Sequence, residues 1–375
     1  MSMLSVHTRG FGSPGRYFQG PGLLNDLRKY TEPYGKKVFV LLDAFFMEEY
    51  TKKLTEAYAG TGSVVLTERF GGETSEKEIE RVTEVARPFA PEVVVGIGGG
   101  KTLDTAKATA DNFHAPVIIA PTTASTDAPT SALSVIYKEN GEHSHARHYV
   151  GSPNVVLADS EVITKAPIRY LVSGMGDALS TYFEARANEL SDSPNYISGG
   201  YRRPKAALAI AKLCYDILLE DGLKAKLAAE QGICCEAVEN IIEANTLLSG
   251  LGFENTGCAG AHSVGDGITG LPEGAGTLHG ERCAFGVICQ LVAEGGSAQE
   301  IEEVVKFNLS VGLPVTLEDM GVEASDDNVR KIVEVSMNSF WDAEPFIVSP
   351  EKAYGDIMAA NILGHYYKEK FGTED

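Results

Sequence analysis

The sequence predicts an α/β domain built on a parallel sheet, followed by an all-α domain. Short β-branched runs alternate with amphipathic helical patterns up to about Ile163, and long helical patterns without strand signals follow. The 375 residues suit two domains of roughly 100–200 residues each. We therefore expect domains over residues 1–164 and 165–375, with a small-molecule site in the cleft between them.

Six runs of aliphatic and β-branched residues are the candidate strands of the first domain. They lie at 37–42, 63–66, 93–97, 116–120, 133–137 and 155–157. Helical patterns at 74–89 and 102–112 separate them. Strands that alternate with helices form a parallel sheet covered on both faces. Such sheets bind ligands beyond the carboxyl ends of their strands, so the residues that follow the strands are candidate ligand contacts.

The second half of the chain consists of helical patterns separated by prolines. These patterns lie at 168–190, 203–220, 224–249, 283–294, 299–311, 326–339 and 350–370. Because no strand signal interrupts them, we expect this domain to be helical throughout.

Composition and charge exclude several classes of partner. Hydrophobic residues make up 43% of the chain and charged residues 22%, as in ordinary globular proteins. The net charge of −20 disfavours nucleic acid and anionic membrane surfaces. No apolar run approaches the roughly 20 residues of a membrane span. The six cysteines form no Cys-x-x-Cys pair and no secretory signal is visible, so we expect reduced thiols in a cytoplasmic protein.

A glycine-rich turn follows the candidate strand at 93–97. Gly98, Gly99, Gly100 and Lys101 lie between this strand and a helical pattern. Glycines there allow a diphosphate to approach the free N–H groups of the helix start, and a lysine can add a donor. The turn matches neither a Gly-x-Gly-x-x-Gly fingerprint nor a Walker loop, and a plain tight turn stays an alternative.

Two further polar features follow strands. Asp43 ends the strand at 37–42, where a carboxylate could hold ribose hydroxyls and repel a 2′-phosphate, which would favour NAD over NADP. A turn or cap aspartate is an equally good interpretation of this residue. The segment 121–127 carries five hydroxyl or carboxylate side chains, which indicates either ligand contacts or a polar loop.

Five of the eight histidines fall into two groups. His143, His145 and His148 lie in a polar stretch between two candidate strands, where a solvated hairpin loop is the favoured interpretation over a metal site. His262 and His279 lie among glycine and alanine, which leave an imidazole room to face a cavity.

Asp177 is an acid within an apolar helical pattern, and a buried carboxylate needs a partner or a metal. One carboxylate and two imidazoles with an open fourth position form a catalytic zinc arrangement. Spacing alone leaves open that Asp177, His262 and His279 are separate structural residues.

Two long segments resemble a known family. Residues 96–107 and 121–132 are similar to the metal-dependent polyol and alcohol dehydrogenases, the family that includes the iron-type enzymes. The similarity continues in order through 174–181, 252–254, His262 and 279–281, and so covers nearly the whole chain. It implies the architecture shared by dehydroquinate synthase and iron-type alcohol dehydrogenases.

The resemblance also implies roles for individual residues. Asp177, His262 and His279 match zinc ligands, Asp127 and His262 match substrate contacts, and Asp43 matches the ribose acid. The diphosphate turn and the remaining cofactor contacts correspond to Gly98, Gly99, Gly100, Lys101, Thr122, Ser125, Ser131, Leu133 and Tyr137.

Two departures from the iron-type branch favour zinc. That branch carries histidines at the positions of Thr181 and Asp266. Three protein ligands with one open position suit zinc better than an all-histidine iron site.

The resemblance thus implies reversible NAD-dependent oxidation of glycerol at C2 to dihydroxyacetone by a homo-oligomer with one Zn²⁺ per subunit. Zinc acts as Lewis acid, the hydride passes to nicotinamide C4, and Asp127, Asp177, His262 and His279 form the catalytic set. A related vicinal-diol dehydrogenase is an alternative. A glycerol-1-phosphate dehydrogenase or a dehydroquinate synthase-like lyase would need basic residues at the cleft, and only Arg282 adjoins these motifs.

Overall fold

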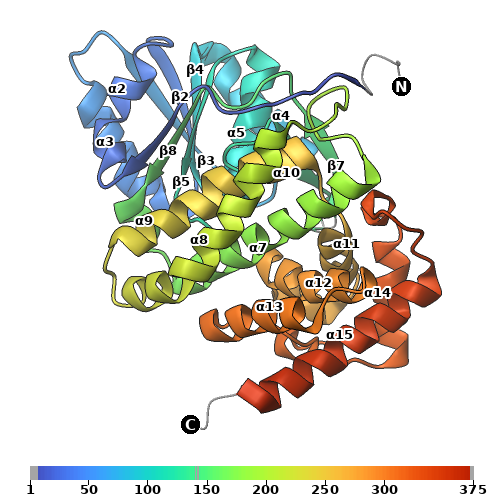
Figure 1. Cartoon of the computed structure of the whole chain (residues 1–375). Coiled ribbons are helices and arrows are strands. Elements are labelled where there is room, and N and C mark those ends of the chain that lie inside the picture. Colours follow the sequence, from blue (N-terminus) through green and yellow to red (C-terminus); the bar gives the residue numbers. More distant parts are fainter. Residues whose placement is uncertain (1–6, 140, 142, 372–375) are drawn as a thin grey trace.

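The computed structural model describes residues 7–139, 141 and 143–371, and its main sheet has six parallel strands in the order β1-β8-β5-β4-β2-β3. The strands are β1 (Tyr17–Gly20), β2 (Lys37–Leu42), β3 (Val64–Arg69), β4 (Val93–Gly98), β5 (Val117–Pro121) and β8 (Val155–Asp159). The sheet lies at one end of the molecule and the later helices at the other (Figure 1). The predicted α/β and all-α organisation is therefore confirmed.

Helices cover both faces of the sheet. Alternate residues of β2 and β4 pack with α2 (Leu27–Thr31) and α3 (Met47–Tyr58) on one face. The intervening residues pack with α4 (Glu76–Ala86) and α5 (Gly100–Phe113) on the other. All six residues of β4 are buried, which explains its continuous aliphatic sequence.

The order of the strands places a switch point between β2 and β4. The chain leaves β2 for the edge strand β3 and then returns to the other side of β2 as β4. At such a point the loops after the two strands diverge and open a crevice, which is where parallel sheets bind ligands. Asp43 follows β2, and the glycine turn begins at the end of β4.

A separate hairpin joins the sheet to the helical half. It pairs β6 (Leu133–Tyr137) with β7 (His143–His148) in antiparallel register. The solvated hairpin loop predicted for His143, His145 and His148 is confirmed as an exposed hairpin, but these residues form its strand β7 and not its loop. Their side chains are exposed. Backbone hydrogen bonds to β6 hold this strand in place, and those bonds do not require buried side chains.

The helices of the second half begin with the short α6 and continue to the end of the described chain. They are α6 (Ser160–Thr164), α7 (Ile168–Ser191), α8 (Lys205–Ala229), α9 (Glu236–Glu243), the π-helical turn η4 (Ala244–Leu248), α10 (Ser249–Thr256), α11 (Gly260–Thr269), α12 (His279–Ala293), α13 (Ala298–Val311), α14 (Asp326–Ser336) and α15 (Pro350–Phe371). Short 3-10 turns are η1 (Leu23–Asp26), η2 (Ala44–Phe46), η3 (Arg87–Phe89), η5 (Pro272–Gly276), η6 (Glu318–Met320) and η7 (Trp341–Ala343).

Three helical predictions were wrong in detail. The single helix expected over 224–249 is interrupted, because α8 ends at Ala229 and α9 begins at Glu236. The break expected between 220 and 224 does not occur, because α8 continues through Gly222, where a Cβ would lie 2.7 Å from the Phe307 ring. The glycine there serves close packing and does not end the helix. Helix α11 was not predicted, because its glycines hide the helical period.

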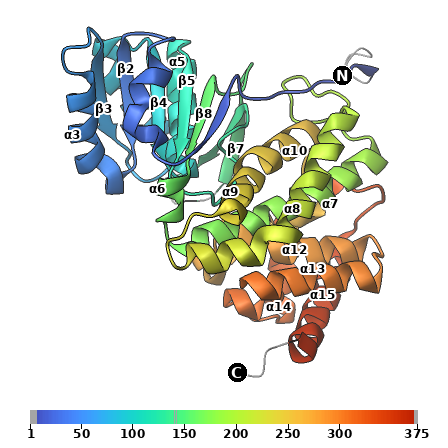
Figure 2. The ribbon, with the colours of Figure 1, turned by 60° about the vertical axis from the view of Figure 1, so that its left-hand side comes forward.

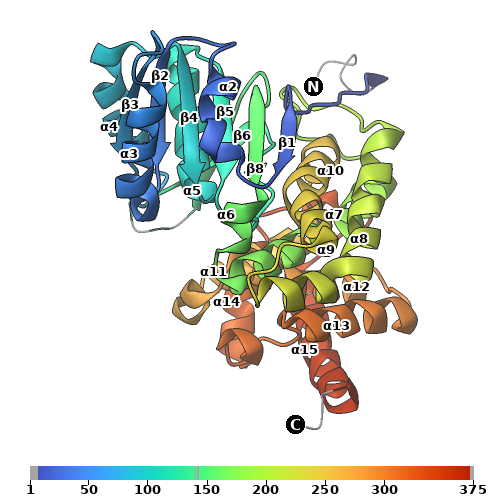
Figure 3. The ribbon, with the colours of Figure 1, turned by 90° about the vertical axis from the view of Figure 1, so that its left-hand side faces the viewer.

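The central helix α7 packs against α8 and α12 in one large apolar core. Figure 2 shows the chain before β1 running from the sheet toward this helical half. There the amide and carbonyl of Gly12 pair with the side chain of Asn255. Figure 3 shows β1 beside β8, and α9 contacts β1. Contacts between the two halves are thus extensive, and the division at 164/165 stays a prediction.

Among the described residues, none of the helices is both long and apolar enough to cross a membrane.

Candidate active site

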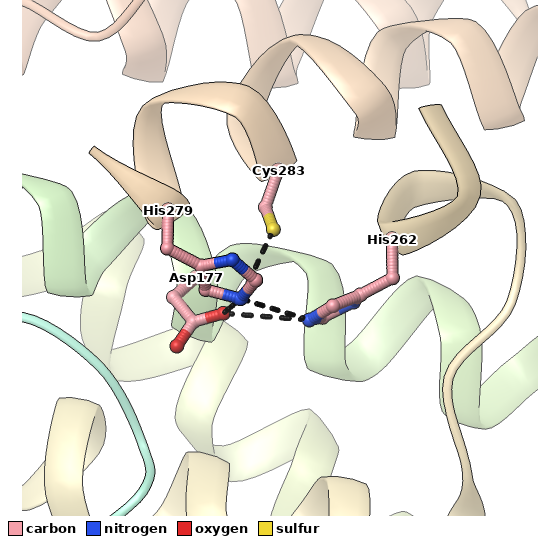
Figure 4. A group of neighbouring side chains, drawn as sticks. All are labelled: Asp177, His262, His279 and Cys283. Atoms are coloured by element: carbon pink, nitrogen blue, oxygen red, sulfur yellow. Dashed lines mark hydrogen bonds and ion pairs between the residues drawn. The ribbon is translucent and has the colours of Figure 1, made fainter. Parts of the chain in front are cut away.

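Three side chains from three helices meet at one point (Figure 4). Asp177 lies within α7, His262 lies in the first turn of α11, and His279 begins α12. Asp177 Oδ1 is 3.2 Å from His279 Nε2 and 3.6 Å from His262 Nε2, and the two Nε2 atoms are 3.3 Å apart. The structure therefore brings together the three residues that the sequence analysis proposed as metal ligands.

Glycines allow the helices to approach closely enough for this meeting. A Cβ on Gly176 would overlap the carbonyl oxygen of Gly280, and a Cβ on Gly280 would overlap that of Ser173. The amide of Gly280 also donates to Ser173 Oγ at 3.3 Å. Backbone contact between α7 and α12 thus places Asp177 beside His279.

A buried glutamate orients His262. Glu184 Oε2 lies 2.7 Å from His262 Nδ1, and Glu184 Oε1 accepts the amides of His262 and Ala259 at 2.8 Å each. Its side chain is fully buried. A carboxylate at this position fixes Nδ1 as the protonated nitrogen and leaves Nε2 free to bind a cation.

Sequence reasoning missed Glu184. The available signal was its position two helical turns after Asp177 in the same apolar helix, which puts both acids on one face.

The donor set fits one divalent cation. Ligands at roughly 2.0–2.2 Å from a tetrahedral ion are about 3.3–3.6 Å apart, and the three donors are 3.2–3.6 Å apart. Within the described residues, the buried Asp177 Oδ1 accepts no hydrogen bond. Such an atom costs free energy unless a cation compensates it.

The two buried acids at the cluster, Asp177 and Asp127, differ in the direction of their pKa shifts. Burial by itself would raise the pKa of Asp177, but the facing imidazoles of His279 and His262 outweigh it and hold that pKa well below its ordinary value. Burial raises the pKa of Asp127 well above its ordinary value, and the negative charge of Asp177 raises it further. Asp177 is therefore the ionised member of this pair of acids.

Asp127 lies next to the cluster, on the loop that follows β5. Its amide donates to Asp177 Oδ2 at 3.1 Å, and its Oδ2 accepts Ser249 Oγ at 2.8 Å. The loop therefore joins the sheet to the three-residue cluster. Ser249, which starts α10, was not predicted from the sequence and carries no motif of its own.

A buried ion pair holds this loop in place. Lys107 Nζ lies 3.2 Å from Asp104 Oδ1 and donates to the carbonyls of Ala128 at 2.5 Å and Leu133 at 3.0 Å. Ser131 is fully buried, and its Oγ donates to the Ala128 carbonyl at 3.3 Å. Leu133 and Ser131, predicted as cofactor contacts, thus also belong to the framework of the loop.

The predicted ribose acid lies at the switch point. The Asp43 amide donates to the Ile97 carbonyl at 2.9 Å, which places the end of β2 beside the end of β4. Its Oδ1 accepts the Phe45 amide at 2.9 Å and caps the following turn. The cap interpretation is therefore correct for Oδ1, and the side chain is also partly exposed at the crevice.

The glycine turn at the start of α5 has room for a Cβ at Gly99 but not at Gly98. A Cβ on Gly98 would lie 2.6 Å from Thr102 Oγ1, whereas a Cβ on Gly99 would have no neighbour closer than Thr123 Oγ1 at 3.9 Å. Among the described residues, no side-chain hydrogen bond caps α5 at Gly99. In the described chain Thr102 Oγ1 is buried without a hydrogen-bond partner. A phosphate could occupy the space over Gly99 and meet the amides of the first turn.

The remaining predicted cofactor contacts surround this turn. The amide of Thr122 donates to the Gly98 carbonyl at 3.0 Å, and Ser125 Oγ lies 3.2 Å from Thr123 Oγ1. Lys101 Nζ is 4.9 Å from the centre of the Tyr137 ring and 2.6 Å from Glu73 Oε2. Lys101 is thus paired with an acid, which sequence reasoning did not foresee.

A parallel sheet with a glycine turn after one strand, together with a cluster of donors suited to one cation, has the features expected of a metal-dependent dehydrogenase. Residues 14–160 match the iron-containing alcohol dehydrogenase family. The chain is 44% identical over 360 residues to the glycerol dehydrogenase of Citrobacter freundii, which covers 95% of this chain and 98% of that protein. It is 40% identical over 367 residues to a glycolaldehyde reductase of Halobacterium salinarum, covering 97% of this chain and 100% of that protein.

The crystal structure of a probable glycerol dehydrogenase from Sinorhizobium meliloti 1021 has a TM-score of 0.90 and 43% identity. The similarity covers 96% of this chain and 99% of that one. The chain therefore belongs to the iron-containing alcohol dehydrogenase family and is an oxidoreductase.

Proposed function

We propose that the chain oxidises glycerol at C2 to dihydroxyacetone, reversibly, with NAD as hydride acceptor and one zinc ion per subunit. The observation that carries this proposal is the convergence of Asp177, His262 and His279 within 3.2–3.6 Å of one another, beside Asp127. Similarity to glycerol dehydrogenases over nearly the whole chain supports the choice of substrate.

The three converging residues would hold the metal, and zinc, when bound, supplies a Lewis acid that lowers the pKa of a substrate hydroxyl. The two positions that carry histidines in the iron-type branch are used differently here. Thr181 Oγ1 lies 2.8 Å from Ser249 Oγ, and Asp266 accepts Ser339 Oγ. Neither adds an imidazole to the set, which favours zinc over iron.

Asp127 orients the substrate. Ser249 donates to Asp127 Oδ2 and so holds this carboxyl beside Asp177. The other oxygen, Oδ1, is then the atom that would contact a hydroxyl of the polyol. Glu184 keeps His262 in the tautomer whose Nε2 faces the substrate region.

The residues at the switch point would bind the cofactor, and NAD, when bound, accepts the hydride at nicotinamide C4. The amides after Gly99 would contact the diphosphate, and Asp43 would hold the ribose hydroxyls. Thr122, Ser125, Ser131, Leu133 and Tyr137 lie on the elements that would surround the rest of the molecule.

Reduction of a small hydroxyaldehyde is the second candidate, because the Halobacterium salinarum protein is named a glycolaldehyde reductase. It would use the same residues in the reverse direction.

A phosphorylated substrate is not favoured, because the basic residues near these motifs already have partners. The guanidinium of Arg282 donates to the Thr277 carbonyl at 2.8 Å, and Lys101 is paired with Glu73.

A substrate panel tests the proposal. Glycerol, propane-1,2-diol, butane-2,3-diol and glycerol 1-phosphate are each offered with NAD and with NADP, and glycolaldehyde with NADH. We expect glycerol with NAD to give the highest kcat/KM and zinc to be present at one per chain. Full activity after exhaustive chelation, or a preference for the phosphate ester, would contradict the proposal. A homo-oligomer in the cytoplasm remains a further expectation, which size-exclusion chromatography and cell fractionation check.

A further inference from the structure

A cysteine sulfur lies in the same cluster as the three proposed ligands. Cys283 lies one helical turn after His279 on α12, and its Sγ is 3.6 Å from His279 Nε2 (Figure 4). The donor atoms of Asp177, His262, His279 and Cys283 all lie within 4.8 Å of one another. The Cys283 side chain is fully buried.

The distance between sulfur and nitrogen matches a shared ion. Zinc binds histidine nitrogen at about 2.0–2.1 Å and cysteine sulfur at about 2.3 Å, which separates the two donors of a tetrahedral ion by about 3.6 Å. Cys283 and His279 have that separation. Residues four apart face the same side of a helix, so α12 presents both donors in one direction.

Asp177 Oδ1 is an independent observation that points to a ligand at this place. The atom belongs to a carboxylate with 1% exposure and, in the described chain, accepts no hydrogen bond. It lies within the group of four donors. The other buried cysteine of α12, Cys289, is not part of the group.

We propose that Cys283 is the fourth protein ligand of the metal in the absence of substrate, and that the polyol displaces its sulfur. This inference rests on the metal site of the proposed function. The thiol releases its proton to solvent when the sulfur binds, and it takes a proton back when the polyol occupies the position. No electron transfer is involved.

The proposal explains how the site can hold its metal and still react. Four protein ligands are typical of structural zinc sites, whereas catalytic sites keep one position open. A displaceable fourth ligand gives a closed site at rest and an open one in the presence of substrate. A sulfur ligand also selects thiophilic ions over Mg²⁺ or Mn²⁺.

Cobalt substitution tests the ligand directly. Co²⁺ is bound to the full-length wild type, to Cys283→Ala and to Cys289→Ala, and the absorption spectra are compared. We expect a near-ultraviolet sulfur-to-cobalt charge-transfer band in the wild type and in Cys289→Ala. In Cys283→Ala this band is absent while the visible cobalt bands remain. When it binds Co²⁺, Cys283→Ala should also release one proton fewer per ion than the wild type does.

Metal affinity provides a second readout. Chelator competition should show that Cys283→Ala binds Zn²⁺ at least roughly 10-fold more weakly, as for loss of a supporting partner of a metal site. Cys283→Val serves in its place if the alanine variant does not fold.

In the cobalt experiment, equal near-ultraviolet spectra for the wild type and the Cys283 variant, with visible cobalt bands in both, would overturn the proposal.

Displacement is tested by adding glycerol to the cobalt enzyme in the presence of NADH, which prevents turnover. The glycerol concentration is chosen as one that saturates the rate of oxidation when NAD is present. At this concentration we expect the charge-transfer band to decrease. A band of unchanged intensity would refute displacement. If the wild type binds no Co²⁺ at one per chain, or if Asp177→Asn binds it equally well, the metal site itself fails and the proposed function fails with it.

Discussion

Glu184 Oε2 lies 2.7 Å from His262 Nδ1, and the acid is fully buried on the same helix as Asp177. One helix thus supplies both a proposed metal ligand and the residue that orients a second ligand. The position of His262 Nε2 depends on this pair, because an imidazole held at one nitrogen by a carboxylate presents the other nitrogen in a fixed direction.

Glu184→Gln should therefore weaken metal binding while the fold is kept. We expect the affinity for Zn²⁺ to fall roughly 10–100-fold, because the amide orients the imidazole less well and makes it a weaker ligand. Chelator competition monitored by residual activity measures the change. Glu161→Gln, on an exposed residue, is the control. Unchanged zinc affinity in Glu184→Gln would show that the contact is only structural.

Removal of the metal or of a ligand should abolish activity and spare the nucleotide site. His262→Ala and Asp177→Asn should lose zinc and turnover, since each removes one donor of the proposed metal site. NADH binding, measured by calorimetry, should stay within a factor of a few because the glycine turn is untouched. Normal activity in either variant after chelation would refute these ligand assignments.

Asp43 offers a test that separates its two contacts. Asp43→Asn keeps an oxygen that can accept the Phe45 amide but loses the charge, whereas Asp43→Gly loses both. We expect both variants to relax the preference for NAD over NADP, because neither repels a 2′-phosphate. The ratio of kcat/KM values for the two cofactors measures this effect. An unchanged ratio in both variants would exclude Asp43 as the discriminating residue.

Gly98 and Gly99 should respond differently to the same substitution. Gly98→Ala forces a Cβ against Thr102, so we expect a loss of about 1–3 kcal/mol in the free energy of unfolding. Gly99→Ala has room and should change stability little, but its methyl group would fill the space proposed for the diphosphate. Thermal unfolding and NADH titration of both variants distinguish the two effects. Wild-type NADH affinity in Gly99→Ala would place the diphosphate elsewhere.

Lys107→Met should destabilise the fold strongly. The variant leaves the Asp104 carboxylate buried without its cation, and it removes the donor to the Ala128 and Leu133 carbonyls. Breaking a buried pair costs about 3–5 kcal/mol. Urea unfolding measures the loss, with Lys53→Met as a control because that exposed ion pair with Glu49 contributes at most about 1 kcal/mol. Equal stability of the two variants would contradict the structural role of Lys107.

Asp104→Asn combined with Lys107→Met should recover part of the stability, because the double variant leaves no unpaired charge. If the double variant is no more stable than Lys107→Met, the loss comes from the broken contacts to the loop carbonyls.

The amino-acid order alone predicted a parallel sheet, the helical second half and the residue types of the candidate site, but not every strand. The edge strand β1 was missed, and the strand predicted at 133–137 lies in the separate hairpin and not in the parallel sheet. Strands and helices follow from side-chain periods of two and 3.6 residues, which neighbouring positions specify. The glycine turn after β4 and the acid after β2 were predictable for the same reason, since they are defined by where each strand ends.

Contacts between distant segments lay outside the reach of such patterns. The period of α7 does not show that Glu184 meets His262, and the period of α12 does not show that Cys283 lies near Asp177. The second of these meetings depends on the backbone contact of Gly176 with Gly280, which joins α7 to α12 and which only the packed helices reveal. The continuity of α8 through Gly222 has the same origin, because the Phe307 ring that requires a glycine there comes from another helix. Local order therefore specified the elements and their chemistry, and packing specified which side chains act together.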